Sequence, residues 1–255
     1  MSVKRKKRLT KKDRYRHLII VAAIIAVCSL FLFRSSEKGR IAFDIRIPAP
    51  YEICGIDVSH YQEKIDWKFI AQLRSGKDSL GILFAFIKAT EGKSLKDPYF
   101  SYNWENAKKN KMLRGAYHYY KPNVNSKLQA NNFIATVKME AGDLPPVLDI
   151  EETGRFGNDN MRKGIKNWLT IIEKHYRVKP ILYCYVDFYE HILSTDEFKD
   201  YPLWIAHYYE DELRVKEKWY FWQHSDKGRI ESIRAKVDFN VFNGTFEELK
   251  ALCKK

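Results

Sequence analysis

The sequence is poor in cysteine and lacks the common metal-binding motifs. Four cysteines occur among 255 residues, at Cys28, Cys54, Cys184 and Cys253, without a Cys-x-x-Cys pair or a Cys/His spacing typical of zinc. No His-Glu-x-x-His motif is present, so we expect neither a metal nor a cofactor at the histidines His60, His118, His207 and His224. A Cys54–Cys253 disulfide would suit an extracytoplasmic domain, but buried free thiols are the interpretation we favour.

Excess positive charge is scarce outside one short segment. The chain has 45 Lys and Arg against 32 Asp and Glu, a net charge of +13. Residues 1–17 hold nine basic residues and one acid, so the remaining 238 residues carry only +5. If residues 1–17 bound nucleic acid, they would do so directly beside the apolar segment 18–33, which is typical of a membrane helix. We therefore expect no nucleic-acid partner. A hydrophobic content of 45% also excludes disorder as the main state.

An uncharged run of sixteen residues, 18–33, follows the basic arm. As a helix it would span about 24 Å of the ~30 Å hydrocarbon core, with flanking Arg, Lys and Tyr side chains as anchors. No Ala-x-Ala cleavage site follows Phe33, which favours an uncleaved transmembrane signal-anchor over a secretory signal peptide. The charge pattern predicts a single pass through the cytoplasmic membrane, with a cytoplasmic arm (1–17), a linker (34–50) and an extracytoplasmic domain (51–255).

Short β-rich runs alternate with helical patterns in the predicted domain, which is typical of an α/β fold with parallel strands. We predict strands at residues 53–58, 80–89, 115–120, 146–150, 181–186, 203–208, 219–224 and 237–242. Helices are predicted near residues 65–73, 99–112, 125–141, 161–176 and 246–253, with short connections between the last strands. Eight strands favour a single irregular (β/α) barrel of the TIM type, in which functional residues lie at the C-terminal ends of the strands.

Two carboxylates stand two residues apart at the end of the fourth predicted strand. Side chains alternate along a strand, so Asp149 and Glu151 would face the barrel mouth with Cα atoms about 6.5 Å apart, while Leu148 and Ile150 face the helices. Two such carboxylates repel when both are charged, which raises one pKa and leaves a carboxylic acid beside a carboxylate. That pairing suits the cleavage of a glycosidic bond.

Aromatic residues accompany the acids at the predicted strand ends, namely Tyr117, Tyr119, Tyr183, Tyr185, Trp204 and Tyr208. Each ring taken alone is better explained by core packing. Flat rings with polar tips also bind sugar faces, however, and together with the acids they indicate an oligosaccharide groove.

Motifs spread in order from Cys54 to Phe242 resemble those of the family 25 glycoside hydrolases, lysozymes that act as N-acetylmuramidases. The matching segments are GIDVSHYQ (55–62), FIKATEG (86–92), GAYHYY (115–120), LDIE (148–151) and VDFN (237–240), together with Trp67, a DPYF segment, and Trp222 followed by Gln223. The resemblance implies an irregular (β/α) barrel that cleaves the β-1,4 bond between N-acetylmuramic acid and N-acetylglucosamine in the glycan strands of peptidoglycan.

The resemblance also implies roles for individual residues. Glu151 matches the proton donor, Asp149 its acidic partner near the substrate's 2-acetamido group, and Asp57 and Asp238 two further acids of the catalytic site. Supporting or substrate-binding roles are implied for Lys88, Glu91, Tyr117 and Gln223. The aromatic residues Tyr119, Tyr185 and Trp204 complete the expected binding set.

Two other functions use the same residues. A catalytically silent barrel that binds peptidoglycan is one, although a pure binder has no need of a costly cluster of four acids. A chitinase-like endoglycosidase, which also carries Asp-x-Glu at a strand end, is the other. We expect a monomeric enzyme tethered to the cell by its N-terminal segment, since no wall-binding repeats follow the predicted barrel.

Overall fold

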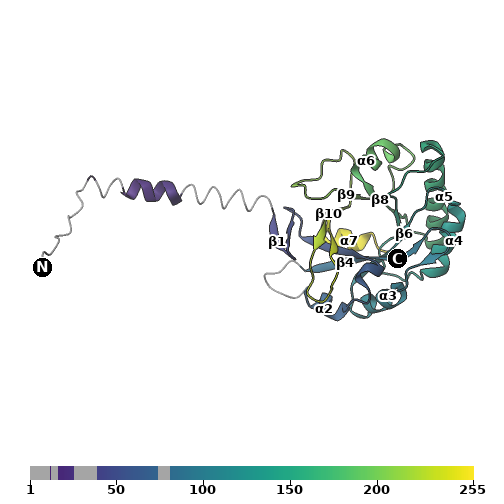
Figure 1. The fold of residues 1–255 in the computed structure, drawn as a ribbon, viewed down its shortest axis with the longest axis horizontal. Coiled ribbons are helices and arrows are strands. Elements are labelled where there is room, and N and C mark those ends of the chain that lie inside the picture. Colours follow the sequence, from purple (N-terminus) through teal and green to yellow (C-terminus); the bar gives the residue numbers. More distant parts are fainter. Residues whose placement is uncertain (1–11, 13–16, 26–38, 74–80) are drawn as a thin grey trace.

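The computed structural model describes residues 12, 17–25, 39–73 and 81–255. Residues 17–25 are helical (Figure 1). Within these described ranges, no helix is both long and apolar enough to cross a membrane. Residues 26–33 of the predicted span lie outside the described residues, as do most of the basic arm, positions 34–38 of the expected linker and position 80 of the second predicted strand. The transmembrane segment therefore stays a prediction.

Eight strands close into a barrel (Figure 1). Around the ring they are β3 (Ile53–Val58), β4 (Ile82–Glu91), β6 (Leu113–Tyr119), β7 (Val147–Asp149), β8 (Ile181–Tyr185), β9 (Leu203–Ala206), β10 (Phe221–Gly228) and β11 (Val237–Phe242). A direct β3–β4 pairing closes the ring, and a short strand, β5 (Leu95–Lys96), pairs with the end of β4. All eight strands fall where the sequence predicts them.

One strand runs against the others. Neighbours from β3 through β4 to β10 pair in parallel, whereas β11 is antiparallel to both β10 and β3. The expectation of parallel strands throughout is therefore wrong at the last position. Only residues 229–236 connect β10 to β11, and a link of that length without a helix returns the chain antiparallel because a parallel crossover needs a dozen residues or more.

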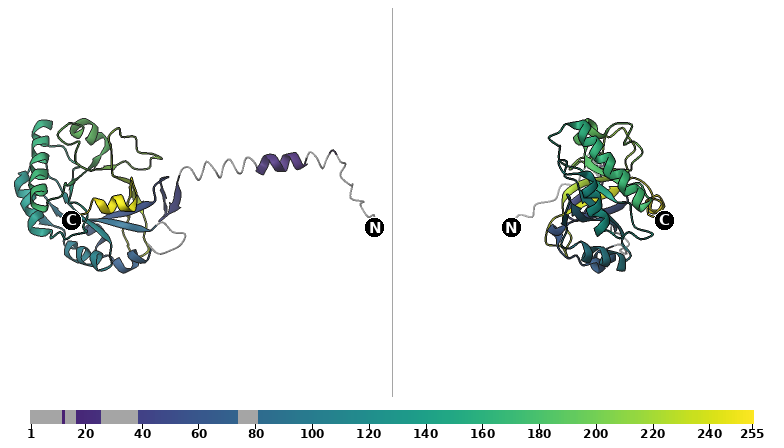
Figure 2. Two further views of the ribbon diagram at one scale, coloured as in Figure 1. Left: turned by 180° about the vertical axis from the view of Figure 1, so that it is seen from behind. Right: turned by 90° about the vertical axis from the view of Figure 1, so that its right-hand side faces the viewer.

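Helices cover the outside of the first half of the barrel. They are α2 (Trp67–Gln72), α3 (Phe100–Lys109), α4 (Ser126–Thr136) and α5 (Asn158–Tyr176), and the view from behind shows α4 and α5, in teal, along one side of the strands (Figure 2). Helix α4 ends five residues earlier than predicted, because Val137 is extended and the chain then turns so that Glu140 and Asp143 bind the buried Arg114. Between β8 and β9 lie a short helix, α6 (Val186–Phe188), and a π-helical turn (Tyr189–Leu193).

Aromatic side chains fill the barrel interior below the strand ends. The rings of Phe86 and Trp204 stack with centroids 4.5 Å apart, and Phe84 meets Phe221 at 5.3 Å. Leu249 of the last helix, α7 (Phe246–Ala251), belongs to this inner cluster, where it packs with the residues that begin several strands. With one end of the barrel filled in this way, a cavity inside the barrel can open only at the carboxyl ends of the parallel strands.

A β hairpin occupies part of the expected linker. Strands β1 (Arg40–Ala42) and β2 (Ile45–Ile47) pair antiparallel, and both isoleucines of β2 are buried. The ring of Phe43 packs against Phe239 at 4.9 Å, and the Arg229 N–H donates to the Phe43 carbonyl at 2.9 Å. Residues 39–50 thus belong to the folded domain. Three-residue strands are too short for a periodic pattern to stand out in the sequence.

The cysteines of the domain remain thiols. Cys54, Cys184 and Cys253 are all free, so the Cys54–Cys253 disulfide does not form. Burial raises the pKa of the Cys54 thiol to about 12 and that of Cys253 to about 11, which makes both poor nucleophiles at neutral pH.

Candidate active site

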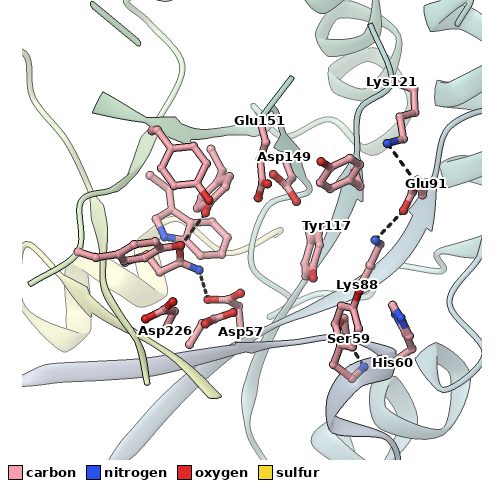
Figure 3. A pocket seen from close by; sticks show the side chains of 18 residues that line it. Asp57, Ser59, His60, Lys88, Glu91, Tyr117, Lys121, Asp149, Glu151 and Asp226 are labelled. Atoms are coloured by element: carbon pink, nitrogen blue, oxygen red, sulfur yellow. Dashed lines mark hydrogen bonds and ion pairs between the residues drawn. The ribbon is translucent and has the colours of Figure 1, made fainter. Parts of the chain in front are cut away.

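A cavity of about 480 Å³ opens at the carboxyl ends of the parallel strands (Figure 3). Eighteen residues line it. They include all eleven predicted site residues, which come from every strand of the ring: Asp57, Lys88, Glu91, Tyr117, Tyr119, Asp149, Glu151, Tyr185, Trp204, Gln223 and Asp238. The barrel therefore brings together the whole predicted set, and the role of each residue in catalysis stays a prediction.

Asp149 and Glu151 lie side by side at the top of this cavity (Figure 3). Strand β7 ends at Asp149, and Ile150 still donates its N–H to Tyr183 at 3.0 Å, so the alternation continues as far as Glu151. Leu148 and Ile150 pack in the outer core as expected. Asp149 is 7% exposed, whereas Glu151 is open to solvent.

The environment makes both carboxyls of this pair hold protons more tightly than usual. Burial, followed by the charge of Glu151, raises the pKa of Asp149 well above its ordinary value. Burial and then the charge of Asp57 raise the pKa of Glu151. The buried Oδ1 of Asp149 accepts no hydrogen bond from the described residues, so nothing on that side favours its ionised form. Both carboxyls of the pair therefore release their protons at a higher pH than isolated carboxyls do.

A second pair of acids faces the first across the cavity. Asp57 on β3 stands directly opposite Asp238 on β11 in the antiparallel register. Burial raises the pKa of Asp57 to about 6, although hydrogen bonds from Asn240 and Gln223 lower it in part. Burial and the charge of Asp57 raise the pKa of Asp238 to about 9. One member of this pair is thus protonated and the other largely ionised at pH 7.

Two buried amides hold the Asp57 carboxylate. The Nε2 of Gln223 and the Nδ2 of Asn240 each donate to Asp57 Oδ2 at 2.7 Å. The oxygens of these amides are occupied in turn. Gln223 Oε1 accepts from the hydroxyls of Tyr183 and Tyr208 at 2.7 Å, and Asn240 Oδ1 accepts from the Trp204 indole at 2.8 Å. Both amides are therefore fixed with their NH₂ groups toward Asp57.

The structure revises the expected role of Trp204. Its side chain is only 2% exposed and stacks on Phe86 in the floor of the cavity. Such a ring offers little surface to a sugar, whereas its indole N–H holds the Asn240 amide. Tyr185, at 36% exposed, and the half-buried Tyr208 stand at the mouth with rings 6.0 Å apart and offer the open faces that sugars bind.

Basic residues form the wall to one side of Tyr117 (Figure 3). The Lys88 ammonium binds Glu91 at 2.8 Å, and Lys121 lies 3.5 Å from the same carboxylate. Burial alone would raise the pKa of Glu91, but its hydrogen bond to Lys88 and the two ammonium charges outweigh burial and lower it. Both ammonium groups also lie over the Tyr119 ring, at 4.8 and 4.6 Å. Glu91 is accordingly an ionised anchor rather than a proton donor.

Several residues that line the cavity escaped the predicted set. Asp226 on β10 is one, because the strand shifts register twice between Gln223 and Gly228 and the two-residue alternation fails there. Lys121 follows the end of β6, and the rule that strand ends carry function would have found it. Ser59, His60 and Tyr61 are further additions, whereas Tyr183 and Tyr208 belong to the aromatic residues expected at the strand ends.

The histidines have separate environments. His118 is buried between Thr90 and Gln129, with contacts of 2.7 and 3.1 Å, while His60 lines the cavity and contacts Asp97. Throughout the described ranges, no group of three or more His, Cys, Asp and Glu side chains is arranged to hold a metal ion.

A barrel whose mouth combines paired carboxyls of raised pKa with open aromatic rings defines a glycoside hydrolase. The sequence profile of the Glycosyl hydrolases family 25 matches residues 56–233. The chain belongs to this family.

Known proteins resemble the chain over most of its length. A protein of Escherichia coli (strain K12), "Uncharacterized protein YegX", is 49% identical over 211 residues, covering 82% of this chain and 76% of that protein. Lysozyme M1 of Streptomyces globisporus is 33% identical over 213 residues, covering 78% and 70%. The structure of a family 25 glycosyl hydrolase from Bacillus anthracis superposes with a TM-score of 0.72 at 33% identity, covering 81% of this chain and 95% of that one.

Proposed function

We propose that the protein is a muramidase that hydrolyses the β-1,4 bond between N-acetylmuramic acid and N-acetylglucosamine in peptidoglycan. The observation that carries the proposal is the Asp149–Glu151 pair at the mouth of an aromatic cleft, with the pKa of both carboxyls raised. The likeness to Lysozyme M1 supports peptidoglycan as the substrate.

Glu151 donates the proton in this proposal. It is the more exposed carboxyl of the pair, so the oxygen of the leaving sugar can reach it. Asp149 lies behind it and is more deeply buried, so burial and the charge of Asp57, rather than Asp149, raise the pKa of Glu151. As the sugar ring gains positive charge in the transition state, the carboxylate of Asp149 stabilises it and orients the 2-acetamido group.

Asp57 favours the protonated form of Glu151 from across the cleft. Its carboxylate, with a pKa of about 6, is largely ionised at neutral pH, and its negative charge is the largest electrostatic cause of the raised pKa of Glu151 after burial. Asp238 remains protonated opposite it because its pKa is about 9. The two acids thus supply one negative charge, held in place by the amides of Gln223 and Asn240.

The full chain, purified in detergent, tests the assignment. Wild type is expected to release reducing ends from peptidoglycan, and Glu151→Gln to lower kcat by about 10²- to 10⁴-fold, the usual contribution of a general acid. Glu231→Gln, a change at an exposed carboxylate away from the cleft, is the matched control and should keep full activity.

Two outcomes would contradict the proposal. Undiminished turnover by a folded Glu151→Gln variant would remove the proton-donor role. A wild-type enzyme that binds wall sacculi without releasing products would instead be a silent binding barrel, and one that cleaves chitin oligomers but not peptidoglycan would be a chitinase-like endoglycosidase. Mass spectrometry of the products identifies the bond that is cut.

We further propose that residues 18–33 hold the enzyme in the cytoplasmic membrane with the barrel outside. The uncharged run and the basic arm before it support this orientation. In cells that produce the full chain, protein of full mass should be found in the membrane fraction, and protease added to spheroplasts should degrade the barrel. A soluble form whose N-terminus lies beyond residue 33 would show that the segment is a cleaved signal peptide.

A further inference from the structure

A second cavity, of about 340 Å³, lies beside the cleft and has no part in the proposed chemistry. The β1–β2 hairpin forms one wall, residues 209–211 form another, and β10 contributes Ser225 and Lys227. The hairpin precedes the region matched by the family profile, which begins at residue 56. The cavity therefore depends on a part of the chain outside that region.

A buried polar atom lies in the lining of this cavity. His224 is only 2% exposed, and its Nε2 has no hydrogen-bond partner among the described residues. Burial lowers the pKa of His224 to about 3, so its ring is neutral and one of its nitrogens is free to accept or donate a hydrogen bond. Buried polar atoms are rarely left without a partner, and an orphaned one beside an open cavity indicates a place for a polar ligand atom.

Charges of both signs surround this histidine. Asp44, Glu210 and Asp211 supply negative charge, and Arg46 and Lys227 supply positive charge. Within the part of the chain that the structure describes, Asp44, Arg46 and Glu210 form no ion pair, so their charges are available to a ligand. A group that carries an ammonium and a carboxylate together would satisfy both signs, whereas a neutral sugar would satisfy neither.

The two cavities share a wall. The hydroxyl of Tyr209, which lines the second cavity, donates to Asp226 Oδ1, and Asp226 lies beside Asp57 in the cleft (Figure 3). The ring of Tyr209 also lies 5.9 Å from that of Tyr208 at the cleft mouth. A chain that branches from a sugar in the cleft needs to pass only this wall, and three extended residues reach roughly 10 Å.

We propose that this second cavity is a subsite for the peptide stem of peptidoglycan and receives the zwitterionic end of its diamino acid. The inference rests on the proposed muramidase function, because the stem branches from the sugar that the cleft would hold. The carboxylate of the diamino acid pairs with Arg46 and its ammonium with Asp44, while a polar atom of the stem meets His224.

Paired substrates test this subsite in the full-length enzyme. One substrate is glycan that carries its stem peptides, and the other is the same glycan freed of peptides by an amidase. Arg46→Gln and Asp44→Asn are each expected to raise KM for the peptide-bearing glycan about three- to tenfold, with kcat and the peptide-free reaction unchanged. Arg234→Gln, at an exposed position that lines neither cavity, controls for a general loss of positive charge.

Calorimetry with a free stem tetrapeptide that contains a diamino acid separates this inference from the muramidase proposal. Wild type is expected to bind the peptide, and Arg46→Gln to bind it more weakly. If Arg46→Gln and Asp44→Asn had the same KM for the peptide-bearing glycan as wild type, the subsite would be overturned while the muramidase proposal stands. If wild type cleaved neither substrate, the muramidase proposal would fail. If titration of wild type with the tetrapeptide gave no heat of binding, the subsite would be overturned.

Discussion

Gln223 provides the sharpest test of how the cleft controls its acids. Its single side-chain amide has three partners, since the NH₂ donates to Asp57 and the oxygen accepts from Tyr183 and Tyr208, each at 2.7 Å. Gln223→Met keeps the shape of the side chain but removes all three hydrogen bonds. Asn240 then remains the single amide donor to Asp57 Oδ2.

The expected size of the effect follows from these contacts. A hydrogen bond to a charged group contributes about 1.5–3 kcal/mol, and about 1.4 kcal/mol corresponds to one pKa unit, so the pKa of Asp57 should rise by about one to two units from its value near 6. The Tyr183 hydroxyl, in a side chain 4% exposed, would lose its partner, whereas the half-buried Tyr208 can turn to water. Together these losses should lower the free energy of unfolding by about 2–4 kcal/mol.

Two measurements follow the two consequences. Carbon-13 NMR of the aspartate carboxyls, assigned with Asp57→Asn, gives the pKa of Asp57 directly, and the acidic limb of the kcat/KM profile should move upward with it. Urea unfolding measures the stability loss. Gln223→Glu is the matched variant, because its carboxylate still accepts from both tyrosines while it removes the donor to Asp57.

Specific results would refute this reasoning. If Gln223→Met is folded and both the pKa of Asp57 and the acidic limb stay unchanged, the amide does not control the carboxylate. If Gln223→Met has the same free energy of unfolding as wild type, the three hydrogen bonds do not contribute the stability assigned to them.

Two further predictions concern stability. Asp57 and Asp238 have folded-state pKa values of about 6 and about 9, above the ordinary 3.8, so the folded state binds more protons than the unfolded chain. The stability that comes from this proton binding is complete below pH 3.8 and is lost as pH rises through 6 and then 9. The free energy of unfolding in urea should therefore be lower at pH 8 than at pH 5. In Asp238→Asn the difference between the two pH values should be smaller. Equal values for wild type at the two pH values would contradict this. Gly115→Ala places a Cβ 2.5 Å from the Phe86 ring inside the barrel and should cost about 1–3 kcal/mol in the same assay, whereas Ser101→Ala on the exposed face of α3 should be nearly neutral.

Local patterns in the sequence were enough to find most of the cleft. The two-residue period places Asp149 and Glu151 on one face of a strand, and the motifs around Asp57 and Asp238 identify the partners across the barrel. The pattern misses Asp226, because the register of β10 shifts within the strand. It also misses the β1–β2 hairpin, whose short strands become recognisable only when Phe43 and the isoleucines of β2 pack on the barrel.

The sequence by itself determined the family, the eight strands and every acid of the cleft except Asp226, because motifs, hydrophobic period and strand-end position are properties of neighbouring residues. Tertiary structure alone decided which groups control those acids. Gln223 and Asn240 reach Asp57 from 166 and 183 residues away, a contact that exists only once the barrel closes with β11 antiparallel to β3. The raised pKa values arise in the same way, since burial and the approach of one charge to another depend on how distant segments pack.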